Sequence, residues 1–334
     1  MNNLKFVDVL LLTFLFLLNT GTAKETESNE LSLEDLKAVA QSMRAVEDSL
    51  LNVRIDSNAW VEEGPSSTGP WERTPVCFST TAFFGKISSR RARIDFHKDV
   101  GRWENGAAPY LQTSFSVSFD GVQGRRKDIS SSYSGKTFDR HSGLILPKEP
   151  IHLRASNEIT GIEASLFFHY RGVPEPLHKR FSTGFDSAAA DPNYLNRPLK
   201  NKAVLEKLGG IQCIKVACIV GSLVQQWWFD PNRGFALLRF EDLRKDQGGN
   251  EHVKSSINVT KLKKVAENIW WPMEAYFVKS PRETDNPWKR IVYRASNVIA
   301  NDPNFDESVF TVLFPKGYLV DDKITGRKYT VGQQ

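Results

Sequence analysis

Three polar side chains that alternate along one stretch of the chain are the first candidates for chemistry. Asp95, His97 and Asp99 are spaced two residues apart, so on a β-strand they share one face and could hold a divalent metal ion. Arg91 and Arg93 stand on the same face and offer the carboxylates charge partners, which favours an ordinary solvated strand face. We therefore predict no metal site and no cofactor.

Two further motifs are incomplete. Residues 134–137 read Ser-Gly-Lys-Thr, but the leading glycine of a phosphate-binding loop is replaced by Ser130. Residues 302–306 resemble the start of a calcium loop, yet its glycine is missing and Leu313 occupies the position of the closing glutamate. The second stretch predicts only an Asp- and Asn-rich turn.

No motif for nucleophilic catalysis is present: the sequence has no G-x-S-x-G, H-E-x-x-H or C-x-x-C, and its six histidines are scattered. A carboxylate pair for glycoside hydrolysis stays open, because its members can come from distant strands. The sequence favours a protein that is not an enzyme, with a hydrolase as a third reading.

The N-terminus predicts export. A basic start, an apolar run over 6–18 and the small residues Gly21 and Ala23 are typical of a signal peptide spanning 1–23, cleaved near Ala23. We expect the mature protein in the periplasm or cell envelope. Export excludes a nucleic-acid partner despite the formal charge of +5, which remains compatible with anionic lipid or envelope polymers.

The three cysteines do not form a disulfide framework. Cys213 and Cys218 are five residues apart, so on one strand they point to opposite faces and cannot bridge each other. Burial as small apolar residues is the favoured prediction, and a bridge from Cys77 to either of the other two is the alternative.

Periodicity predicts a mainly β (α+β) chain. Apolar residues at three- and four-residue spacing predict one helix over 32–53, with Ser32 and Asp35 forming a weak capping box. Period-two segments follow, and about 10–12 antiparallel strands are expected in total. Such a sheet must curl, which predicts a curved half-barrel covered by the N-terminal helix and a central insertion.

Residues 24–334 are expected to form a single domain, interrupted by a helical and loop insertion at about 125–210. Short helices are expected at 159–170 and near 203–208. Strands then resume; those expected after the insertion span 211–220, 225–229, 234–241, 256–265, 270–279, 290–299, 309–314 and 328–331.

Apolar and aromatic side chains are the strongest candidates for a binding site. The apolar strand faces exceed what one helix can cover, so the sheet either fills its own interior or leaves a cavity for an apolar ligand. The cavity-lining residues predicted from the pattern are Phe78, Ile94, Phe96, Phe115, Val117, Phe119, Trp227, Phe229, Phe235, Leu237, Trp271 and Met273.

A loose resemblance to a known family rests on four stretches: 90–96 (Arg-Arg-Ala-Arg-Ile-Asp-Phe), the hairpin 227–239, the strand opening at 270–272 (Trp-Trp-Pro), and 314–332. With the exported helix, these stretches resemble the LolA-type outer-membrane lipoprotein carrier superfamily, in particular its large secreted bacterial relatives. The resemblance implies an unclosed half-barrel around an apolar cavity that holds lipid chains. The carriers control their lid with an arginine, and Arg91 and Arg93 are the candidates for such a polar gate.

The leading hypothesis is an exported, non-enzymatic protein that binds an acyl chain, a lipoprotein or another apolar ligand. Its rival is an envelope interaction or sensor module on the same fold, which would bind a protein partner through the charged stretch 171–202.

Overall fold

One large β-sheet makes up most of the described chain. The structure is a computed structural model. The residues it describes are 30–86, 91–100, 111–133, 136–138, 141–147, 200–220, 223–245, 248, 250–280 and 288–333. The predicted signal peptide and the predicted helix at 159–170 lie outside these residues.

Sixteen strands form this sheet, more than the 10–12 predicted. The strands before the gap at 148–199 are β1 Asn52–Gly64, β2 Glu72–Gly85, β3 Ala92–Val100, β4 Leu111–Phe119, β5 Gly124–Tyr133, β6 Lys136–Phe138 and β7 Ser142–Leu146. Those after it are β8 Lys200–Leu208, β9 Ile211–Val220, β10 Leu223–Asp230, β11 Ala236–Lys245, β12 Glu251–Ala266, β13 Ile269–Lys279, β14 Trp288–Ala300, β15 Leu319–Asp322 and β16 Arg327–Thr330.

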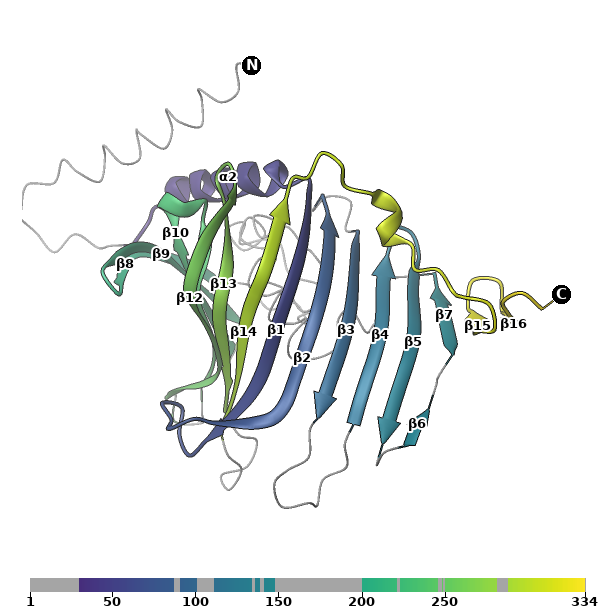
Figure 1. The fold of residues 1–334 in the computed structure, drawn as a ribbon. Helices are drawn as coiled ribbons and strands as arrows, with labels where there is room; N and C mark the ends of the chain where they lie inside the picture. The colour runs from purple at the N-terminus through teal and green to yellow at the C-terminus, as the bar shows by residue number, and fades with distance from the viewer. Residues whose placement is uncertain are drawn as a thin grey trace, which may run out of the picture.

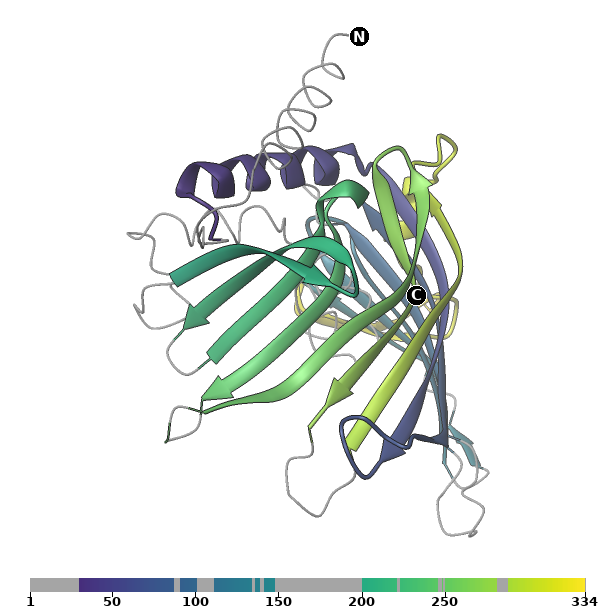
Figure 2. The same ribbon diagram turned by 90° about the vertical axis from the view of Figure 1, so that its left-hand side faces the viewer.

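The strand order shows how the two parts of the chain meet. It runs β16-β15-β7-β5-β4-β3-β2-β1-β14-β13-β12-β11-β10-β9-β8, with β6 paired to β5 alone. Antiparallel pairing of β1 with β14 joins the two halves, and β15 with β7 is the parallel pair among the described strands. The sheet curls strongly but does not close into a barrel (Figures 1 and 2). The predicted fold class, a curved and mainly antiparallel half-barrel, is confirmed.

The helix α2, Leu33–Ser49, begins where the capping box predicts. The Ser32 hydroxyl accepts a hydrogen bond from the Asp35 backbone N–H, and the Asp35 carboxylate accepts one from the Ser32 N–H. Pairing of both groups satisfies backbone donors that a helix start leaves open. The helix ends at Ser49, earlier than predicted, because Val53 already belongs to β1 and pairs with β2 and β14. None of the described helices is long and apolar enough to cross a membrane.

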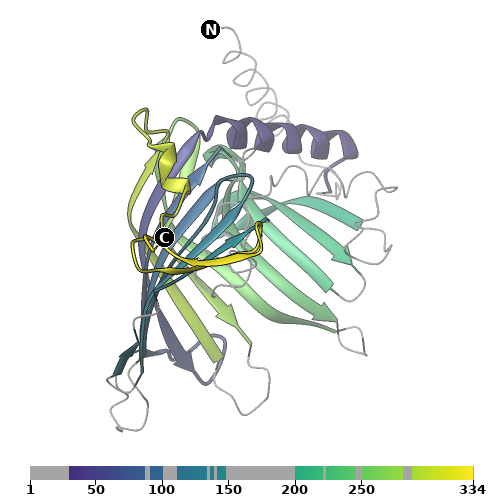
Figure 3. The ribbon, with the colours of Figure 1, turned by 90° about the vertical axis from the view of Figure 1, so that its right-hand side faces the viewer.

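The C-terminal segment, residues 301–318, runs over the outer, convex face of the sheet and then joins its edge as β15 and β16 (Figures 1 and 3). Its 3-10 helix η4, Glu307–Phe310, replaces the start of the strand predicted over 309–314. Phe310 and Val312 are buried, and the Val312 N–H donates to the Ser118 hydroxyl at 3.3 Å. The buried side chains of Phe310 and Val312 therefore pack this segment against the sheet.

Two predictions about the insertion are wrong. Residues 203–208 form part of β8, because every residue from Lys200 to Leu208 pairs with β9. The sheet also continues beyond residue 125 through β5, β6 and β7. The structure therefore describes sheet at both ends of the predicted insertion, up to Leu146 and from Lys200 onward.

Candidate functional site

A row of three aromatic rings crosses the inner face of the sheet, by which we mean its concave side. Phe78 on β2, Phe96 on β3 and Phe115 on β4 are all buried. Their ring centroids lie 5.9 Å apart for Phe78 and Phe96, and 4.9 Å apart for Phe96 and Phe115. Side chains two residues apart on a strand share a face. Phe96 pairs with Phe115 of β4 and with Thr80 of β2, which is two residues from Phe78, so the three rings lie on the same face. The row forms the centre of the candidate site.

The structure gathers the predicted cavity residues into two apolar clusters. The larger cluster, from β1–β4 and β12–β14, includes Phe78, Ile94, Phe96, Phe115, Val117, Phe119 and Trp271, with Met273 packed against it. The smaller cluster includes Trp227, Phe229 and Leu237, with Phe235 packed against it. Phe240 packs against both clusters and links them. The alternation pattern thus selected residues of one continuous apolar surface.

Coverage of this surface by α2 is confined to one end. Leu36, Val39 and Met43 of the helix belong to the smaller cluster, with residues of β8–β11. The N-terminal contribution to the larger cluster begins with Leu50, just after the helix. Among the described residues, therefore, α2 covers the β8–β11 end and leaves the inner face of β1–β4 to be covered by other groups (Figure 2).

Two basic side chains, which sequence reasoning missed, flank the aromatic row. The Lys98 ammonium lies 5.6 Å from the centroid of the Phe78 ring, and the Arg126 guanidinium lies 4.9 Å from that of Phe115. Arg126 also pairs with Asp128 at 2.7 Å. Lys98 could have been found, since it is two residues from Phe96. Arg126 was missed because the predicted sheet did not include β5, where Arg126 pairs with Val117 of β4. An amphipathic ligand on the row would meet the Lys98 ammonium at one end and the Arg126–Asp128 ion pair at the other.

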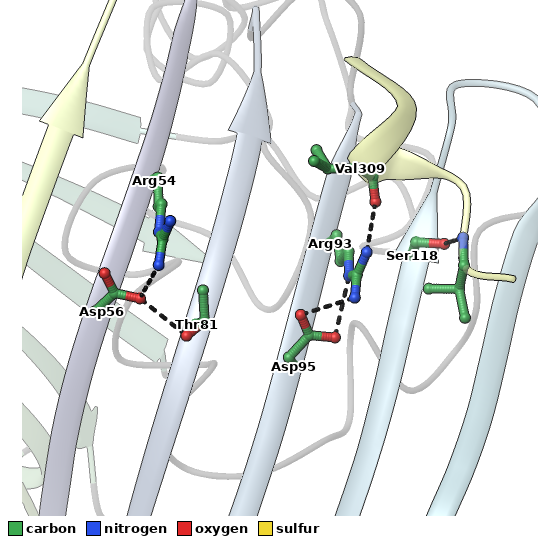
Figure 4. Close-up of polar contacts among 8 residues, drawn as sticks. Arg54, Asp56, Thr81, Arg93, Asp95, Ser118 and Val309 are labelled. Carbon is green, nitrogen blue, oxygen red and sulfur yellow. Dashed lines mark hydrogen bonds and ion pairs between the residues drawn. The ribbon is translucent and has the colours of Figure 1, made fainter. Parts of the chain in front are cut away.

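Arg91 and Arg93, the predicted polar gate, lie on the outer face. Arg93 pairs with Asp95 at 3.0 Å and donates to the Val309 carbonyl at 3.2 Å (Figure 4). Arg91 forms an ion pair with Glu307. Both side chains thus bind the C-terminal segment, and they point away from the apolar inner face that they were expected to gate.

A polar groove of about 460 Å³ crosses the outer face of β1–β4. Asp56, Asp95 and His97 line it with the hydroxyls of several serines and threonines. Partial burial acts to raise the pKa of Asp56, but hydrogen bonds from Thr81, Arg54 and Asn297 together lower it. The row of Arg54, Asp56 and Thr81 is drawn in Figure 4. A carboxylate kept ionised in this way is unsuited to act as a general acid.

Two residues of the metal alternative, Asp95 and His97, have other partners in this groove, and the side chain of Asp99 is outside the described set. Asp95 is occupied by Arg93, and the Nδ1 atom of His97 lies 2.7 Å from the Ser114 hydroxyl. Within the described part of the chain, no group of three or more histidine, cysteine or acidic residues is placed to hold a metal ion.

Cys77 and Cys213 are present as thiols, so the alternative of a bridge from Cys77 to another cysteine is wrong. Cys213 is fully buried beside Trp228 on β10, as the preferred prediction has it. Burial raises the pKa of its thiol, and the nearby Asp230 and Glu206 carboxylates act in the same direction. The side chain of Cys218 is outside the described set.

Comparisons with known proteins give structural similarities only. No protein-family model and no curated protein matches the sequence. The fold is similar to a domain from Vibrio parahaemolyticus described as an outer membrane lipoprotein-sorting protein, with TM-score 0.45, 8% identity, and coverage of 83% of this chain and 97% of that one. A DUF1329 family protein from Desulfovibrio piger gives TM-score 0.39, 13% identity, and coverage of 84% and 97%. LprF from Mycobacterium bovis gives TM-score 0.26, 12% identity, and coverage of 85% and 97%.

Proposed function

We propose that this protein binds an acyl chain, or another long apolar ligand, along the inner face of its curved sheet. The observation that supports this most is the continuous apolar inner surface, of which α2 covers only the β8–β11 end. Each methylene removed from water contributes about 0.8 kcal/mol, so a chain of about fourteen carbons releases on the order of 10 kcal/mol before the costs of association. Binding of this kind needs no catalytic or metal-binding group.

The proposal includes a location and a ligand class. Export through the predicted signal peptide at 1–23 would bring the protein to the periplasm or cell envelope, where lipids and lipoproteins are abundant. The mature chain, 24–334, would act as a single non-enzymatic unit. The aromatic row with Lys98 and Arg126 at its ends favours a ligand that has an apolar body and a polar or anionic group.

The test is native mass spectrometry of the protein purified from its own envelope without detergent exchange, followed by solvent extraction and lipid analysis. A stoichiometric acyl-bearing ligand is expected. A protein that is free of lipid and instead retains a protein partner would contradict the proposal and favour the interaction module. In a separate assay, turnover of a glycoside would favour the hydrolase.

A further inference from the structure

A buried hydroxyl without a hydrogen-bond partner interrupts the apolar inner face. Thr80 of β2 is only 4% exposed, and its Oγ1 atom has no hydrogen-bond partner among the described residues. Alternation along β2 places Thr80 on the same face as Phe78 and Ala82, which both belong to the larger cluster. The chain therefore keeps an unsatisfied polar group in the middle of the surface where the proposed ligand lies.

Thr74, on the same strand, is a buried threonine whose hydroxyl is fully paired within the protein. Thr74 is also buried, at 8% exposure. Its hydroxyl donates to the Val61 carbonyl at 3.0 Å and accepts from the Val76 N–H at 3.3 Å. Buried polar groups are nearly always paired in this way, and leaving one unpaired destabilises the folded chain. Valine has almost the same shape and would avoid that cost at position 80, so the hydroxyl needs another explanation.

The surroundings of Thr80 indicate what would satisfy its hydroxyl. Its partner across the β2–β3 pair is Phe96, the central ring of the aromatic row. Lys98, the next residue on the same face of β3, lies above Phe78. A hydrocarbon chain on the row would offer Thr80 no acceptor, whereas an acyl carbonyl or carboxylate oxygen would accept its hydrogen bond. A carboxylate would also be attracted by the nearby Lys98 ammonium group.

We propose that Thr80 donates a hydrogen bond to the acyl carbonyl of the ligand, so that the protein selects fatty acids or fatty-acyl esters over plain hydrocarbons. This inference rests on the proposed function and adds the substrate class. It places the polar end of the acyl group beside the Phe78–Phe96–Phe115 row, with Lys98 close enough to favour a free carboxylate.

The experiment compares three fluorescent probes on the full-length chain and its variants: cis-parinaric acid, its methyl ester, and diphenylhexatriene, which has no hydrogen-bonding group. For Thr80→Val we expect about three- to tenfold weaker binding of the acid, the loss associated with one hydrogen bond, and unchanged binding of diphenylhexatriene. Thr80→Ser should restore the affinity. A loss for the ester as well means that the carbonyl itself is recognised, and a loss for the acid alone means that a carboxylate is recognised.

Thermal unfolding supplies the matched control. Without ligand, Thr80→Val should unfold at the same or a higher temperature than the original chain, whereas Thr74→Val should unfold at a lower one, because it breaks two hydrogen bonds. If the original chain binds the probes but Thr80→Val changes its affinity for the acid and for diphenylhexatriene equally, or changes neither, this inference is wrong and the proposed function stands. If no probe binds the original chain, the proposed function itself fails.

Discussion

Replacement of Phe96 by alanine tests whether the aromatic row is part of both the protein interior and the ligand site. Phe96 is 3% exposed and lies between two other rings, each tilted to it, so its removal should lower the free energy of unfolding by about 3–5 kcal/mol, as for other buried phenylalanines. If the ligand takes the place of groups that cover the ring and contacts about 50 Å² of it, the lost contact is worth about 1.3 kcal/mol, or roughly a tenfold weaker affinity. Urea unfolding measures the first quantity and fluorescent-probe titration the second.

Phe83→Ala is the matched control for this variant. Phe83 lies on the outer face of β2, half-buried between the guanidinium groups of Arg54 and Arg93, which are 5.7 Å and 5.9 Å from its ring centroid. Its loss should cost less stability and leave probe affinity unchanged. The reasoning would be refuted if Phe96→Ala cost less than about 1 kcal/mol, or if both variants weakened probe binding equally.

Three further predictions concern the parts that frame the site. Ser32→Ala removes the helix cap and should lower the free energy of unfolding by about 1 kcal/mol, measured by urea unfolding; no change would show that the capping box is dispensable. Gly143→Ala places a Cβ atom 2.6 Å from the Phe314 ring, so we expect a loss of about 1–3 kcal/mol and faster proteolysis of the C-terminal segment, and an unaltered digest would contradict this packing. Because burial raises the pKa of the Cys213 thiol, its thiolate is scarce and shielded; iodoacetamide should modify Cys213 only in denaturant, and rapid modification of the folded chain would contradict its placement. The same shift means that the folded chain holds this proton more tightly than the unfolded chain, so its contribution to stability is lost as the pH rises above about 8.5.

Local patterns in the sequence were enough to predict the helix and the inner apolar face. The start of α2 follows from Ser32 and Asp35 because capping depends on neighbouring residues alone. The inward position of Phe96, Phe115 and Val117 follows from alternation. The exposure of the alternate face does not follow, because Ser116 and Ser118 are buried as well and Ser118 accepts a hydrogen bond from Val312 of the C-terminal segment. Whether a ligand shares that face with the chain's own side chains is not a local property, and it stays a prediction.

Features that depend on distant pairing could not be predicted. The run Ala203–Leu208 contains Leu, Glu and Lys, which favour a helix when taken alone, but pairing with β9 on one side makes it a strand. The parallel pairing of β15 with β7 joins residues far apart in the chain. The family resemblance alone suggests Arg91 and Arg93 as a gate. Their partners in the structure, Glu307 and Val309, are 216 residues away along the chain, and no local pattern indicates such contacts.

Photo-crosslinking with a diazirine-bearing fatty acid tests the central claim most directly, because successive residues of a strand point to opposite faces. After irradiation and peptide mapping at residue resolution, we expect labels on inner-face residues such as Phe78, Phe96 and Phe115. Labels confined to their outer-face neighbours, such as Ser79 and His97, or no labelling that unlabelled fatty acid can compete away, would contradict binding inside the curved sheet.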